Sequence, residues 1–229
     1  MTNFFKRFRW GSDVFVTYWL LLILVVVFAA QCLSGGFSYT NLLRLGAMYN
    51  PLVAVRQQWW RLFTAQFLHM GVLHLATNAV MVYYMGNYLE RILGHWRFLT
   101  VYLLAGIGGN MASFAWGSDN AVAAGASTAL FGLFGAMAVL GLLNRDQPAL
   151  RQLGQQSLAL ALINIAIDVF MPNVDIWGHL GGLLAGGLFC LLVGSGNWRS
   201  AKPAWRIAAT ILLAVYVVIC VRQGLSVSL

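Results

Sequence analysis

The sequence has very little charge for its length. Only 9% of its 229 residues are charged, and the six Asp and Glu residues are outnumbered by fourteen Lys and Arg. A soluble domain usually has about a quarter of its residues charged. With 60% hydrophobic residues and a mean hydropathy of +0.76, this chain cannot cover a water-facing surface. The composition therefore excludes an ordinary soluble domain and predicts an all-α, polytopic membrane helix bundle.

Cysteine is also scarce, and the sequence lacks the usual motifs for binding a metal, a cofactor or nucleic acid. Cys32, Cys190 and Cys220 are far apart and form no C-x-x-C or Cys/His ligand spacing, so we interpret them as small buried side chains. The absence of H-E-x-x-H, and of acidic residues near the histidines of residues 69–74, argues against a metal centre. No soluble cofactor domain is visible, and no cofactor is expected. No run of Lys and Arg interleaved with aromatics supports nucleic-acid binding, so we attribute the net charge of +8 to membrane orientation.

What the sequence does contain is a series of long apolar segments. A membrane-spanning helix needs about 20 mostly apolar residues. Seven segments meet this expectation approximately: 14–31, 68–89, 98–116, 123–143, 157–171, 176–193 and 205–221. The first follows Lys6, Arg7 and Arg9 like a signal peptide, but it is too long and lacks a convincing cleavage site, which favours a retained helix. Residues 32–67 are too polar to span and predict short amphipathic pieces at the membrane surface.

The basic residues orient this arrangement. With the N-terminus inside, ten of the fourteen basic residues lie on the cytoplasmic side, and only Arg44, Arg56, Arg61 and Arg222 lie outside. The positive-inside rule therefore predicts a cytoplasmic N-terminus and an external C-terminus. In this topology His74, Ser127 and His179 all fall within roughly 10 Å of the outer surface, since each lies a few residues into its segment.

These polar residues suit nucleophilic catalysis. Ser127 begins a predicted helix, where the unpaired backbone N–H groups and the helix dipole favour negative charge. Histidine is the usual base for such a nucleophile, and glycines 178, 182 and 186 would let the His179 helix approach a neighbour closely. Serine at a helix contact is nevertheless common in membranes, so Ser127 alone is weak evidence.

Other polar residues in or beside these segments are predicted to support the nucleophile or to serve structure. His74 and Asn78 share one helix face and could donate hydrogen bonds to an oxyanion, although a polar helix contact would also explain them. His69 is expected at the interface, and His95 in a solvated turn. Asp168 and Asp175 flank the turn before His179; we expect Asp175 at the surface and a structural role for Asp168, and favour a Ser–His dyad.

Together these motifs resemble the rhomboid intramembrane serine proteases. The resemblance covers residues 14–193 and is carried by short motifs in a fixed order: Trp60-Arg61, His69, His74, Asn78, Glu90-Arg91, Gly125-x-Ser127, Phe131-Gly132 and His179-x-x-Gly182-x-x-x-Gly186. Two positions depart from the commonest pattern. Thr128 stands where glycine is frequent, and Gly178 stands where alanine is frequent.

The resemblance implies a role for each of these residues. Ser127 is the nucleophile and His179 the general base, and His74, Asn78 and the Ser127 N–H form the oxyanion hole. The remaining residues implied to support the site are Gly125 behind the nucleophile, Phe131 stacked on His179, Gly182 in the helix contact, and Trp60 and Arg61 anchoring the first loop.

The expected protein is a serine endopeptidase that cleaves transmembrane helices of membrane proteins near the non-cytoplasmic face. We expect a multi-pass protein of a plasma membrane or bacterial inner membrane. Its expected partners are the lipid bilayer and membrane-protein substrates. The expected organisation is a cytoplasmic tail (1–13), a six-helix rhomboid core (14–194) with a membrane-associated loop (32–67), a cytoplasmic loop (195–204), and a seventh transmembrane helix with a short tail (205–229). Two alternatives remain open, a catalytically inactive relative that binds membrane clients and a small transporter.

Overall fold

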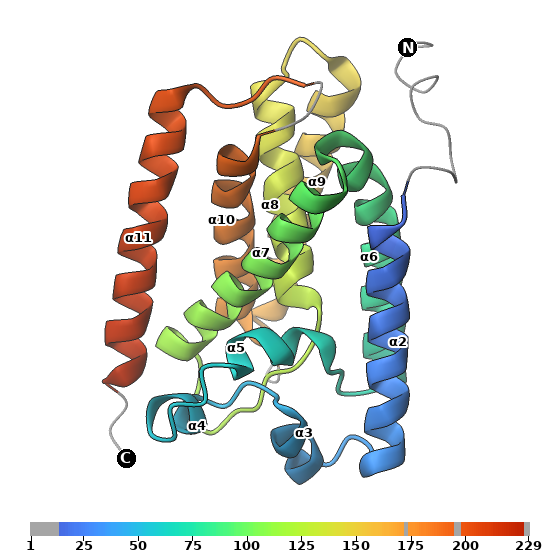
Figure 1. The fold of residues 1–229 in the computed structure, drawn as a ribbon, viewed down its shortest axis with the longest axis vertical. Helices are drawn as coiled ribbons and strands as arrows, with labels where there is room; N and C mark the ends of the chain where they lie inside the picture. Colours follow the sequence, from blue (N-terminus) through green and yellow to red (C-terminus); the bar gives the residue numbers. More distant parts are fainter. Residues whose placement is uncertain (1–13, 172–173, 195–197, 227–229) are drawn as a thin grey trace.

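The computed structural model describes residues 14–171, 174–194 and 198–226. Seven long helices lie side by side in it (Figure 1). They are α2 (Val16–Ser34), α6 (Val72–Leu93), α7 (His95–Trp116), α8 (Ser127–Leu143), α9 (Pro148–Asp168), α10 (Ile176–Val193) and α11 (Pro203–Leu225). By length and composition, α2, α7, α10 and α11 could each cross a membrane. The chain is a multi-pass membrane protein with an all-α helix bundle, as the composition predicts.

Short helices fill the connection between α2 and α6. They are α3 (Tyr39–Leu45), α4 (Asn50–Ala54), α5 (Arg61–Thr64) and the 3-10 helix η1 (Ala65–Phe67), which gather at one end of the bundle (Figure 1). This agrees with the short pieces expected there. Two helix starts differ from the predicted segments. The helix α9 begins at Pro148 instead of residue 157, and proline is well tolerated in a first helical turn. The helix α8 begins at Ser127 instead of residue 123. The expected tail 1–13, residues 172–173 that follow the fifth segment, part of the 195–204 loop and residues 227–229 lie outside the described residues.

Glycines bring α8 and α10 into close contact at the centre of the bundle. A Cβ added to Gly182 would overlap the carbonyl oxygen of Thr128, and one added to Gly186 would overlap that of Gly132. The two backbones therefore touch directly, which is how helices without large side chains associate in lipid. Cys190 on α10 and Cys220 on α11 are buried as expected, whereas Cys32 is exposed on α2.

A buried carboxylate at the far end of α6 caps α2. Glu90 accepts hydrogen bonds from the backbone N–H groups of Phe15 (3.0 Å), Val16 (2.9 Å) and Thr17 (2.7 Å), and from the Thr17 hydroxyl (2.7 Å). Its Oε1 also lies 2.6 Å from Nδ1 of His95. The sequence predicts His95 in a solvated turn; in the structure its side chain is 36% exposed and also contacts Glu90. The first N–H groups of a helix lack partners within the helix, so this carboxylate satisfies them.

Glu90→Ala is expected to destabilise the protein by about 3 kcal/mol, because it leaves these buried donors of α2 without an acceptor. The measurement is the midpoint of SDS-induced unfolding in detergent micelles. Glu90→Gln, which keeps one acceptor oxygen, should give an intermediate midpoint. Equal midpoints for the wild type and Glu90→Ala would contradict this role.

Candidate active site

Ser127 and His179 come together from separate helices. Ser127 is the first residue of α8, and His179 lies in the first turn of α10. Their Oγ and Nε2 atoms are 2.9 Å apart, a hydrogen-bond distance. The contact depends on the helix approach at Gly182, where any side chain would strike Thr128. His179 itself is only 7% exposed.

Asp168 completes a chain of three side chains. It is the last residue of α9, and its Oδ2 lies 2.7 Å from Nδ1 of His179. Both side chains are largely shielded, with 12% and 9% of their surfaces exposed. If His179 Nδ1–H donates to the carboxylate, the Nε2 lone pair is free to accept the Ser127 proton. The sequence favours a Ser–His dyad with a structural role for Asp168, and the structure places the Asp168 carboxylate directly against the histidine.

Phe131 fixes the imidazole from one face. Its ring stacks on His179 with a centroid separation of 4.1 Å and an interplanar angle of 14°. Phe131 lies four residues after Ser127 in α8, so one helix presents both the hydroxyl and the stacking ring. The ring plane of His179 is thus restrained by Phe131 while its two nitrogens are held by Ser127 and Asp168.

His74 approaches the same space from α6. A Cβ built on Gly125 would lie 2.9 Å from His74 Nε2 and 3.6 Å from Ser127 Oγ, so the imidazole edge and the hydroxyl border one small volume. Gly125 has φ = +154°, a conformation that glycine adopts without strain. Asn78 lies one turn farther along α6, is 5% exposed, and donates one amide N–H to the His74 carbonyl at 3.0 Å. Its second amide N–H remains for another acceptor.

The sequence predicts His69 at the membrane interface; in the structure its side chain is completely buried within the protein. It lies in the connection between η1 and α6, with its ring 5.2 Å from that of His74 in a T-shaped arrangement. Burial lowers the pKa of His69 to about 4, so it is uncharged at neutral pH. His69 therefore packs against His74 without adding a charge beside it.

Asp175 also differs from its expected surface position. It is half-buried and is the N-cap of α10, accepting a hydrogen bond from the Gly178 N–H at 2.9 Å. An aspartate directly before an apolar helix is a recognised start signal, so this role could have been found in the sequence. The cap fixes the first turn of α10, which carries His179.

Arg61 anchors the first loop. It is 4% exposed, and its guanidinium donates to the Ala47 carbonyl (2.7 Å) and to Gln58 Oε1 (2.7 Å). The same group lies 4.7 Å from the centroid of the Trp60 ring. Trp60 and Arg61 therefore belong to the scaffold of the loop and not to the Ser127 cluster. In the described residues there is no group of three His, Cys, Asp or Glu side chains that could hold a metal ion.

Comparison with known proteins decides the family. Residues 56–197 match the Rhomboid domain family, which is more than half of the chain. The chain belongs to the rhomboid family. The match includes Ser127, His179, Asp168, His74 and Asn78.

Several rhomboid relatives are similar over most of this chain. It is 34% identical over 218 residues to "Rhomboid protease GluP" of Bacillus subtilis, covering 95% of this chain and 42% of that protein. It is 35% identical over 165 residues to "RHOMBOID-like protein 7" of Arabidopsis thaliana, covering 69% and 51%. "Rhomboid-like protease 3" of Toxoplasma gondii is 33% identical over 187 residues, covering 80% and 69%. The chain thus spans about half the length of the first two relatives.

Proposed function

We propose that this rhomboid protein is an active intramembrane serine endopeptidase. The observation that carries the proposal is the 2.9 Å contact between Ser127 Oγ and His179 Nε2. A hydroxyl within hydrogen-bond reach of an imidazole, itself oriented by a third group, is the arrangement of an activated nucleophile. The names of relatives such as "Rhomboid protease GluP" support proteolysis as the reaction.

The proposed reaction is acyl transfer through a covalent intermediate. Ser127 Oγ attacks the carbonyl carbon of the scissile peptide while His179 Nε2 takes the hydroxyl proton. His179 then gives this proton to the leaving amine nitrogen as the C–N bond breaks. Water, deprotonated by the same nitrogen, hydrolyses the ester on Ser127. Asp168 holds the His179 ring and stabilises the imidazolium that forms in each half of the reaction.

Three donors are proposed to receive the oxyanion. The Ser127 N–H has no partner within its own helix, because Ser127 is the first residue of α8. His74 borders the same volume, and Asn78 follows one turn later on the same helix face. Donors fixed in a site with little water stabilise negative charge as it develops on the carbonyl oxygen.

His74→Ala is expected to lower kcat by about 10²–10³-fold, since one oxyanion donor is lost while the nucleophile and base remain. Initial cleavage rates over a range of substrate concentrations measure this, and KM should change little. Thr77→Ala, at an exposed position of the same helix, is the matched control and should retain the wild-type rate. A wild-type kcat for His74→Ala would remove His74 from the proposed hole.

The proposed substrates are membrane proteins with a transmembrane helix. A helix hides its carbonyl groups in backbone hydrogen bonds, so the substrate must unwind locally before Ser127 can attack. Segments with small or helix-breaking residues near the membrane surface should therefore be preferred. The positive-inside distribution supports placing the Ser127 end of α8 on the non-cytoplasmic side of a plasma or bacterial inner membrane.

A fluorophosphonate probe tests this proposal without knowledge of the substrate. It should label the purified wild type in detergent, and mass spectrometry of the digest should find the adduct on Ser127. Ser127→Ala should not be labelled. Absence of labelling in folded wild-type protein would instead favour the alternative, a catalytically inactive relative that binds membrane clients.

A further inference from the structure

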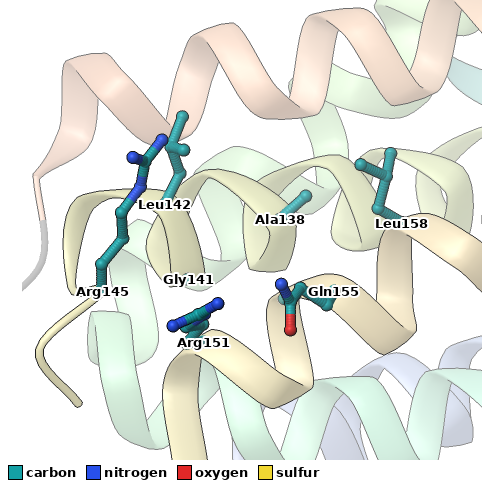
Figure 2. A pocket seen from close by; sticks show the side chains of 8 residues that line it. Ala138, Gly141, Leu142, Arg145, Arg151, Gln155 and Leu158 are labelled. Atoms are coloured by element: carbon teal, nitrogen blue, oxygen red, sulfur yellow. The ribbon is translucent and has the colours of Figure 1, made fainter. Parts of the chain in front are cut away.

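A cavity lies at the end of the bundle opposite Ser127. Its volume is about 360 Å³, and it is formed where the end of α8 meets the beginning of α9 (Figure 2). The residues of α8 that line it, Ala138 to Leu142, lie 11 to 15 residues after Ser127, so at about 1.5 Å per residue they are roughly 16 to 23 Å from the reactive serine. It is therefore a separate site.

The cavity combines two cationic side chains with an amide. Arg145, Arg151 and Gln155 line it, and Figure 2 shows both arginines toward one end of the pocket. Within the described residues, neither arginine makes a hydrogen bond or an ion pair with another side chain. The adjacent carboxylate, Asp146, lies instead 3.4 Å from Arg199. Two positive charges therefore line this cavity, and in the described part of the chain neither is paired with a carboxylate.

The rest of the lining is apolar side chain or glycine. Leu158 lies toward the other end of the pocket from the arginines, and Leu142 and Ala138 continue this surface along α8 (Figure 2). Leu142 is 54% exposed and Leu158 41% exposed. The floor is backbone, because α8 and α9 cross at two glycines. A Cβ on Gly141 would lie 2.9 Å from the Gly154 Cα.

We propose that this pocket binds an anionic phospholipid from the leaflet at that end of the bundle. Guanidinium groups bind phosphate oxygens with paired hydrogen bonds, and Arg151 stands in the first turn of α9, where the helix dipole also favours an anion. An acyl chain would lie along Leu142 and Leu158. Basic pockets between transmembrane helices on the cytoplasmic side suit such headgroups. The same phosphate chemistry could be offered by a soluble anion, so the experiment must separate the two sources.

The test is lipid binding measured by native mass spectrometry. Purified protein is titrated with phosphatidylglycerol or with phosphatidylcholine of the same chain length. The wild type should retain phosphatidylglycerol preferentially. Arg145→Gln with Arg151→Gln should weaken this binding about tenfold or more, because each basic residue contributes at the membrane surface. Arg44→Gln with Arg56→Gln, two exposed arginines elsewhere in the chain, removes the same charge and should leave binding unchanged.

Four results would overturn the proposal. They are equal retention of the two lipids, wild-type affinity in the Arg145 and Arg151 double variant, equal loss in the control variant, or displacement of phosphatidylglycerol by millimolar inorganic phosphate. The last would identify a site for a soluble anion. Because all of these measurements work equally well on Ser127→Ala protein, their outcome is independent of the proposed proteolysis.

Discussion

Ser127→Ala is expected to abolish cleavage of a transmembrane reporter, with a loss on the order of 10³–10⁶-fold in kcat. The variant lacks the oxygen that would form the acyl-enzyme, so His179 Nε2 has no side-chain hydroxyl to activate. The measurement is the rate at which purified protein in detergent or proteoliposomes cuts a single-pass reporter, followed by gel and by mass spectrometry of the products.

The control for this experiment is a buried serine elsewhere in the bundle. Ser157 lies in α9, is 7% exposed and stands eleven residues, or roughly 16 Å along the helix, before Asp168, so Ser157→Ala removes a hydroxyl away from the site. It should cleave at the wild-type rate. His179→Ala should fail as Ser127→Ala does, because the two residues act as a unit. Undiminished cleavage by Ser127→Ala would refute the proposed mechanism.

Asp168→Asn is expected to lower kcat by about 10²–10⁴-fold while changing KM little. The asparagine amide can donate a hydrogen bond to Nδ1 of His179, at the position where the carboxylate now accepts one. The imidazole would then carry its proton on Nε2 and could no longer accept the proton of Ser127. Asp168 is thus a positioning residue, because it acts on the substrate only through His179.

A spectroscopic measurement separates this role from a structural one. In histidine-labelled protein, ¹⁵N NMR should report the Nδ1–H tautomer of His179 in the wild type and the Nε2–H tautomer in Asp168→Asn. Asp175→Asn makes the same chemical change at the α10 cap, so it should affect unfolding and leave the His179 tautomer unchanged. A wild-type kcat for Asp168→Asn, or an unchanged His179 tautomer, would show that Asp168 does not position the histidine and would favour a Ser127–His179 dyad.

The sequence predicted much of this fold because a bilayer restricts the possible solutions. Backbone groups in lipid must be satisfied within helices, so length and hydropathy alone located the seven long helices approximately. Boundaries were less well predicted where polar residues begin a helix. The fifth helix starts at Pro148, earlier than expected, because Arg151 and the three glutamines of residues 148–156 weaken the hydropathy signal of its first turns.

The sequence by itself determined the family, the helices and the pairing of Ser127 with His179, because these depend on local patterns and on spacing that one chain carries. Only the tertiary structure decided what surrounds that pair. It brought Asp168 against His179 and buried His69 beside His74. It also left Arg145 and Arg151 facing a cavity far from Ser127. Each of these depends on how helices distant in sequence rotate and pack against one another, and no spacing within a single segment encodes that.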